Sequence, residues 1–279
     1  MAKGFSLHIG LNSVDPNHYD GWDGQLVACE NDAQDMHSLA QSQGYSSRKI
    51  LLTKQATRNA VTKELTRLSK AMKKGDILLL TYSGHGGQLP DKNNDENDHQ
   101  DETWVLYDGE IVDDELYNLY SKFADGVRIV ILSDSCHSGS VSRDAHYMRT
   151  YGSEKRRYRF MPSSVALRTY LKNKKFYDKI LTQQAGGDNN PKKKTFSATL
   201  KASVRLISGC MDNQLSSDGD FNGLFTGTLL QIWNNATYSG TYTKFVRDIR
   251  RQMPPDQTPR HYLIGKHNAA FNKQRPFEI

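Results

Sequence analysis

The sequence lacks the usual marks of a membrane or secreted protein. It has no run of about 18 or more apolar residues, the length that a transmembrane helix needs. Its three cysteines, Cys29, Cys136 and Cys210, are too few and too odd in number for a disulfide framework. The N-terminus leads directly into an apolar, strand-like run at 5–9 and does not resemble a signal peptide. We therefore expect a cytoplasmic protein without membrane contact.

Internal repeats and low-complexity tracts are also absent, but charge is distributed unevenly. The formal net charge is +6, yet fourteen Lys or Arg stand against four Asp or Glu within 143–194. The reverse holds within 91–115, which has eleven acidic residues and a single Lys. A nucleic-acid-binding face would need ordered basic side chains interleaved with aromatic ones, and the basic segment offers few aromatics. Nucleic-acid binding is therefore disfavoured, although it stays open as an alternative.

Apolar, strand-like runs alternate with amphipathic, helix-like segments along the chain. Strands are predicted over 5–12, 49–53, 77–81, 103–107, 127–133, 204–208 and 261–264. Helices are predicted over 31–43, from the cap residue Thr57 to 72, from 113, and over 224–234 and 243–253. This alternation predicts an α/β protein built around a doubly wound sheet. The length of 279 residues is sufficient for one large domain.

Two short motifs directly follow predicted strands and carry candidate catalytic side chains. Ser-Gly-His-Gly occupies 83–86, and Asp-Ser-Cys-His-Ser-Gly occupies 134–139. The carboxyl ends of neighbouring parallel strands face one crevice, which would bring His85 and Cys136 within reach of each other. An imidazole beside a thiol favours the nucleophilic thiolate. Taken singly, however, such a His is more often a satisfied polar residue and such a Cys a packed apolar one.

The two motifs resemble those of caspase-like cysteine peptidases, most closely the metacaspase and bacterial orthocaspase branch. The resemblance covers 1–140 and 203–265 and leaves the basic segment unmatched. It implies a three-layer fold with a central, mostly parallel sheet between helices. It also implies a Cys136 nucleophile and a His85 base. We therefore predict a single peptidase domain that covers 1–279. It consists of a large-subunit-like part at 1–142, a basic linker or insertion at 143–202 and a small-subunit-like part at 203–279.

Backbone donors and an acidic pocket complete the implied site. The N–H groups of Gly86 and Cys136 would hold the oxyanion, since the glycine leaves room for the substrate backbone. By resemblance, the pocket for the residue before the cut consists of Cys29, Asp32, Ser83 and Asp134. Carboxylates in a cleft bind a guanidinium through charge-assisted hydrogen bonds, which predicts cleavage after Arg or Lys. On the residues alone, Asp32 equally suits the first turn of a helix, where an acid favours the dipole.

Acidic residues after the first motif raise the question of calcium. The resemblance places three ligands of calcium-dependent relatives at Asp101, Asp113 and Asp114. The fourth expected position is Arg143, a cation, with Asp144 beside it. Calcium binding therefore stays open, and we expect that no cofactor is required. The alternative for the acidic loop at 91–102 is a solvated cover of the cleft or an attractor of basic substrates.

Two C-terminal runs, 208–214 and 223–226, look like the small-subunit portion of this family. Cys210 lies in the first run, has no base assigned to it, and is interpreted as a packing residue. The run Asp-Gly-Asp-Phe-Asn-Gly at 218–223 opens like a calcium loop but has Leu229 at its twelfth position, so we predict a turn.

The combined prediction is a monomeric cysteine endopeptidase that cleaves protein or peptide substrates after Arg or Lys. The basic linker contains the residue types that the acidic pocket should accept, so we predict a zymogen that cuts itself there. Before activation this segment would lie over the cleft or against 91–102. The alternatives are an exposed linker that other proteases cut, and, in a different functional class, a catalytically silent scaffold or basic nucleic-acid-binding adaptor.

Overall fold

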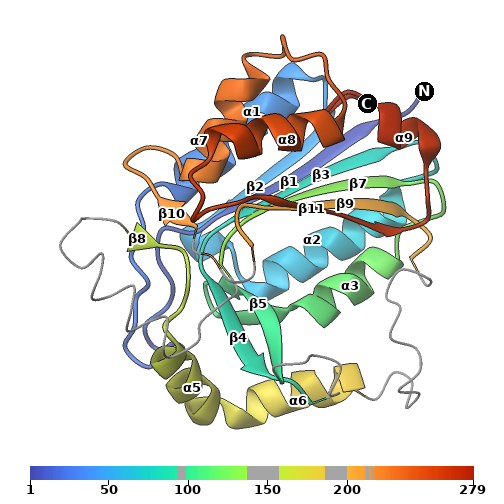
Figure 1. Cartoon of the computed structure of the whole chain (residues 1–279). Coiled ribbons are helices and arrows are strands. Elements are labelled where there is room, and N and C mark those ends of the chain that lie inside the picture. The colour runs from blue at the N-terminus through green and yellow to red at the C-terminus, as the bar shows by residue number, and fades with distance from the viewer. Residues whose placement is uncertain (93–98, 137–156, 186–199, 212–213, 215) are drawn as a thin grey trace.

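A six-stranded sheet forms the centre of the computed structural model, which describes residues 1–92, 99–136, 157–185, 200–211, 214 and 216–279 (Figure 1). Its strands are β1 (Gly4–Gly10), β2 (Ser47–Leu52), β3 (Ile77–Ser83), β7 (Arg128–Asp134), β9 (Ser203–Ser208) and β11 (Arg260–Gly265). Their order across the sheet is β11-β9-β7-β3-β1-β2. All neighbours are parallel except β11, which runs antiparallel to β9 at one edge.

Helices cover both faces of this sheet (Figure 1). One face carries α1 (Cys29–Ser42), α7 (Leu224–Trp233), α8 (Tyr242–Gln252) and the short α9 (Ala269–Lys273). The other carries α2 (Arg58–Ala71), which follows a 3-10 turn, η1 (Thr53–Gln55), and α3 (Asp113–Ser121). The predicted fold class, a central and mostly parallel sheet between helical layers, is therefore confirmed.

Strand β3 shows why this sequence forms a sheet with helices packed on both of its faces. All seven of its residues are buried, as expected of a central parallel strand. Leu78 and Leu80 pack in the core beneath α2 and α3, whereas Ile77 and Leu79 pack in the core beneath α1, α7 and α8. Thr57 caps α2 as predicted, because its hydroxyl accepts a hydrogen bond from the backbone N–H of Ala60 at 3.1 Å.

A small antiparallel sheet continues from the end of β3. It contains β4 (Gly86–Pro90), β5 (Gln100–Leu106) and β6 (Gly109–Val112). The strand predicted over 103–107 belongs to this sheet and not to the central one. Because β4 begins directly after His85 and pairs with β5, the small sheet fixes the backbone that follows the first motif.

The segment predicted as a basic linker contains ordered elements in its described part. These are β8 (Arg157–Tyr158), α5 (Ser163–Lys172) and α6 (Lys174–Ala185). The Tyr177 hydroxyl on α6 lies 2.7 Å from Nε2 of His18, and Met161, just before α5, is buried beside Val165 and Ala166. Strand β8 pairs antiparallel with β10 (Ser217–Asp218). Residues 157–185 are thus packed onto the domain.

No helix in the described ranges combines the length and the apolar character that crossing a bilayer requires.

Candidate active site

The two sequence motifs meet because β3 and β7 are neighbours in the central sheet. Ser83 and Asp134 are register partners at the carboxyl ends of these strands. The backbone N–H of Gly84 donates to the carbonyl oxygen of Asp134 at 3.4 Å. The chain turns that carry His85 and Cys136 therefore leave the sheet side by side, as the sequence predicts.

Two backbone N–H groups from these turns converge on one carbonyl oxygen. Those of Gly86 and Cys136 both donate to the backbone oxygen of Arg159, each at 3.0 Å. These are the two donors predicted to hold an oxyanion. Their arrangement polarises whichever carbonyl binds between them and would stabilise negative charge developing on its oxygen.

The His85 imidazole is buried and held by a backbone carbonyl. Its Nε2 lies 2.9 Å from the oxygen of Gly24, and the Trp22 ring packs 4.7 Å from it, centroid to centroid. Since a carbonyl oxygen only accepts, Nε2 must carry the proton, which leaves the Nδ1 lone pair free to take one. Burial lowers the pKa of His85 to about 4, so the ring is neutral at neutral pH.

Gly24 supports the imidazole in a way that the sequence did not reveal. Its φ is +55°, in the left-handed region that favours glycine, and a Cβ there would lie 3.1 Å from His85 Nε2. A backbone carbonyl therefore orients the base where many enzymes use a carboxylate.

The Cys136 thiol is fully buried beneath the segment at 157–161. Its sulfur accepts a hydrogen bond from the backbone N–H of Ser216, and it packs in a small cluster with Cys210, Tyr158 and Phe160. Among the described residues no hydrogen bond joins His85 to this sulfur. Both residues instead face the Arg159–Phe160 peptide: Cys136 N–H binds the Arg159 oxygen, and the Phe160 backbone interacts with the His85 ring. Cys210 is buried, as its interpretation as a packing residue requires.

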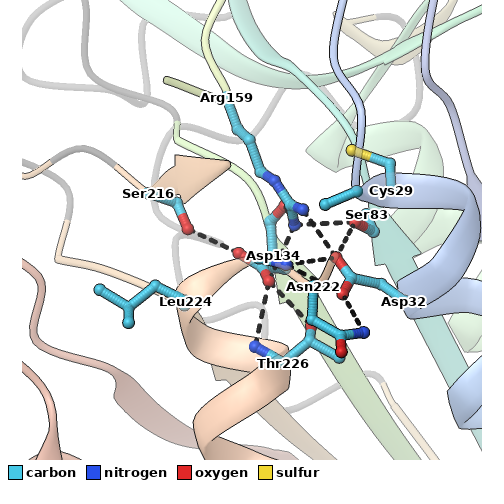
Figure 2. Close-up of polar contacts among 12 residues, drawn as sticks. Cys29, Asp32, Ser83, Asp134, Arg159, Ser216, Asn222, Leu224 and Thr226 are labelled. Carbon is cyan, nitrogen blue, oxygen red and sulfur yellow. Dashed lines mark hydrogen bonds and ion pairs between the residues drawn. The ribbon is translucent and has the colours of Figure 1, made fainter. Parts of the chain in front are cut away.

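A pocket of carboxylates beside the thiol encloses the Arg159 guanidinium (Figure 2). This side chain has no exposed surface, and its terminal nitrogens lie 2.7 Å from Asp32, 2.8 Å from Asp134 and 3.0 Å from Asp218. It also donates to the Ser83 hydroxyl at 2.7 Å. Three of the four predicted pocket residues, Asp32, Ser83 and Asp134, thus contact one guanidinium.

The remaining predicted member, Cys29, is buried beside Ser83 at the pocket wall and forms no ion pair there (Figure 2). Burial raises the pKa of its thiol, so Cys29 stays protonated at neutral pH. Asp218 corrects the interpretation of 218–223 as only a turn. Its carboxylate has no exposed surface, binds Arg159, and accepts hydrogen bonds from the backbone N–H groups of Val27 and Ala28 ahead of α1.

The charges in this pocket suit a cationic occupant. Burial raises the pKa of Asp32, and the neighbouring Arg159 opposes that effect. Burial alone would lower the pKa of Arg159, but the surrounding carboxylates, Asp134 foremost, raise it well above its ordinary value. Removing one partner of a buried ion pair raises the free energy of the protein, because the other charge is left buried and unpaired. The carboxylates of an empty pocket would therefore strongly favour binding of a new cation.

Residues at the start of α7 form the remaining wall. The Asn222 amide and the Gly223 N–H donate to Asp32 at 3.0 and 3.1 Å, and the Thr226 hydroxyl donates to Asp134 at 2.8 Å. A Cβ at Gly223 would lie 2.5 Å from the guanidinium carbon of Arg159. The absence of a side chain at this position therefore makes room for the pocket's occupant.

The suggested calcium ligands come from the small antiparallel sheet and from the helix that follows it. Asp101 lies on β5, while Asp113 and Asp114 begin α3. Within the described residues no group of three or more His, Cys, Asp or Glu side chains is placed to hold a metal ion. Arg143 and Asp144, which the resemblance also invokes, lie outside the described residues.

A thiol and an imidazole at adjacent strand ends, with paired backbone donors, define a cysteine-peptidase type of site on a caspase-like fold. A sequence profile described as the caspase domain matches residues 14–277, and the chain belongs to this family. It is therefore a cysteine-type endopeptidase that acts on protein substrates.

Similar proteins agree with this assignment. Metacaspase-1 of Emericella nidulans is 30% identical over 97% of this chain and 72% of its own length. Metacaspase-1 of Schizosaccharomyces pombe is 29% identical over 98% of this chain and 69% of its own length. The crystal structure of protein GSU0716 from Geobacter sulfurreducens is 52% identical, with a TM-score of 0.89 over 99% of this chain and 98% of that one. Caspase-1 of Spodoptera frugiperda shares the fold. It is 9% identical, with a TM-score of 0.56 over 99% of this chain and 92% of its own.

Proposed function

We propose that this peptidase cleaves after Arg or Lys by means of a His85–Cys136 dyad. The observation that carries the proposal is the buried guanidinium of Arg159, which lies among Asp32, Asp134 and Asp218 while its own carbonyl oxygen lies between the two backbone donors. Side-chain recognition and carbonyl activation thus act on one and the same residue. A substrate Arg bound in this way would have its carbonyl carbon presented to the nucleophile.

The dyad chemistry follows from the tautomer of His85. Nδ1 takes the thiol proton, and the Cys136 thiolate attacks the carbonyl carbon of the residue in the pocket. The N–H groups of Gly86 and Cys136 hold the resulting oxyanion. When the C–N bond breaks, His85 gives its proton to the leaving amine and a thioester remains. His85 then takes a proton from water, whose oxygen attacks the thioester and releases a carboxylate and the thiol.

The pocket predicts a clear order among substrates. Fluorogenic peptides that end in Arg or Lys are expected to be hydrolysed, and matched peptides that end in Asp are expected to react at least about 100-fold more slowly. The physical reason is that an Asp side chain would meet two or three carboxylates without a cation. The measurement is kcat/KM for the three peptides on one enzyme preparation. Faster hydrolysis of the Asp peptide would overturn the proposed specificity.

We further propose that the enzyme processes itself in the basic segment. The pocket suits Arg and Lys, and 143–194 is rich in both. Several of these residues, including Lys155, Arg156 and the run at 192–194, lie outside the described residues.

Calcium removal is expected to change the activity little. Every step proposed above uses protein groups and water, and Arg143 places a cation where the resemblance expects a ligand. Hydrolysis of an Arg peptide should therefore stay within about twofold across a titration with EDTA. Addition of millimolar calcium to the chelated enzyme serves as the matched control. Complete loss with EDTA and recovery with calcium would show that other oxygens complete a site.

A further inference from the structure

We propose that residues 157–161 are bound as this enzyme's own substrate and that the peptide bond between Arg159 and Phe160 is the one it cuts in itself. This inference rests on the proposed function and adds to it the position of the cut and a means of regulation. Three sets of contacts fix the segment: on the side before the bond, at the bond, and on the side after it.

Before the bond, the segment adds a strand to the wall of the cleft. Arg157 and Tyr158 pair antiparallel with Asp218 and Ser217, and the Arg159 N–H donates to the Ser216 oxygen at 3.0 Å. Peptides bind many proteins by this kind of strand addition, in which backbone hydrogen bonds give affinity and side-chain pockets give selectivity. Here the side chain that enters the pocket belongs to Arg159.

At the bond, two backbone donors hold the carbonyl oxygen. The Arg159 oxygen accepts from both candidate oxyanion donors, Gly86 and Cys136, at 3.0 Å each. The residue whose side chain fills the acidic pocket is therefore the residue whose carbonyl is activated. Two other basic side chains of the described segment are engaged elsewhere, Arg168 with Asp20 and Lys174 with Asp178. The geometry selects Arg159 among them.

After the bond, the chain is held by backbone contacts with β4. Phe160 bridges Gly86 of β4, and the Met161 N–H donates to the Gly86 oxygen at 2.8 Å. Met161 is buried and leads directly into α5. The amine formed on Phe160 by cleavage would consequently remain tied to the domain, whereas the Arg159 end would be kept only by its strand pairing and its pocket.

A small cavity beside the bond leaves space for the hydrolytic water. Its volume is about 140 Å³, and its lining includes Gly86, Cys136, Phe160 and Ala166. The self-cut is then balanced: the Arg159 carbon bonds to the Cys136 sulfur, and the C–N bond to Phe160 breaks. His85 delivers the thiol proton to the Phe160 nitrogen. One water molecule then converts the thioester to an Arg159 carboxylate and restores the thiol.

The same contacts make the intact chain its own inhibitor. An external Arg cannot enter the pocket while Arg159, with no exposed surface, occupies it. We therefore expect external peptide hydrolysis to begin with a lag that ends as the cut at Arg159 accumulates and its new carboxyl end leaves the pocket.

The test compares purified wild type with four variants: Arg159→Gln, Arg159→Lys, Arg157→Gln and Cys136→Ala. Each protein is incubated, and its new N-termini are mapped by mass spectrometry. The hydrolysis of an external Arg peptide is measured in the same samples. Wild type and Arg159→Lys should acquire a new N-terminus at Phe160. Cys136→Ala should not, and Arg159→Gln should form it at least about 100-fold more slowly, because its side chain is uncharged. Arg157→Gln removes the same charge from an exposed side chain two residues earlier and should still be cut at Phe160.

The external peptide separates failure of this inference from failure of the proposed function. Arg159→Gln should hydrolyse it without a lag, which also shows that the variant is folded. Wild type that hydrolyses Arg peptides from the first seconds and never acquires the Phe160 terminus would overturn the inference while leaving the proposed function standing. A Phe160 terminus in Cys136→Ala at the wild-type rate would also overturn it. Wild type inactive in both assays would count against the proposed function itself.

Discussion

Replacement of Cys136 by Ala is expected to lower peptidase activity by at least about a thousandfold, and His85→Ala should have a similar effect, because members of a dyad act as one unit. In the proposed mechanism the sulfur supplies the bond to the substrate carbon, and neither of the other described thiols belongs to a residue whose backbone N–H donates to the Arg159 oxygen. In the same mechanism His85 would supply the proton transfers at both stages. Burial lowers the pKa of His85 to about 4, so its ring is neutral and can accept a proton.

Cys210→Ala provides the matched control for this loss. Its thiol is also buried, packs in the same small cluster as Cys136, and lies 3.5 Å from the carbonyl oxygen of Ser135. The substitution removes the same atom a short distance away and should leave kcat/KM within a few-fold of wild type. Thermal unfolding of all three variants checks that the fold survives. Near wild-type turnover by Cys136→Ala would show that the nucleophile is wrongly assigned.

Asp134→Ala is expected to lower kcat/KM for Arg peptides roughly ten- to a thousandfold, on the order of 1.4 to 4 kcal/mol of transition-state binding. Asp134 lies 2.8 Å from the bound guanidinium and is held in place by the hydroxyls of Ser216 and Thr226. Its loss would remove one of the charge-assisted contacts that we propose for a substrate Arg. Gly223→Ala tests the same pocket without changing its charge, because the added Cβ would overlap the guanidinium.

Asp220→Asn is the matched control for the pocket. Asp220 lies in the same loop as Asp218, two residues further on, but its side chain is exposed. Loss of this charge should leave the hydrolysis of Arg peptides unchanged within about twofold. If Asp220→Asn were as damaging as Asp134→Ala, the effect would arise from the overall charge of the protein and not from the pocket.

The sequence was sufficient to predict the parts of this protein that depend on local patterns. Apolar runs such as 77–81 form buried parallel strands whatever lies far away, and parallel strands place their carboxyl ends together. Motifs placed at those ends therefore predicted the neighbourhood of Ser83, Asp134 and Cys136 without knowledge of the loops. The acidic pocket at Asp32 needed the family resemblance in addition, because the first turn of a helix explains that residue equally well.

The remaining parts of the site depend on long-range packing that no local pattern encodes. Asp218 reaches the pocket only because β10 pairs with β8 and its carboxylate is held by the backbone ahead of α1. Gly24 orients His85 through a backbone carbonyl, a group that every residue carries, so no residue type could signal it. Arg159 is one of many basic residues in its segment, and only the packing that places its side chain among the carboxylates and its carbonyl oxygen between the two backbone donors singles it out.

The most direct test of the central claim is to treat self-processed enzyme with a peptide electrophile that ends in Arg and to map the modified residue by mass spectrometry. We predict one label per chain, on the sulfur of Cys136, formed much faster than with the matched Asp-ended reagent and suppressed by an excess of Arg-ended peptide substrate. Labelling of Cys29 or Cys210 in preference to Cys136, or equal labelling by the two reagents, would contradict the account.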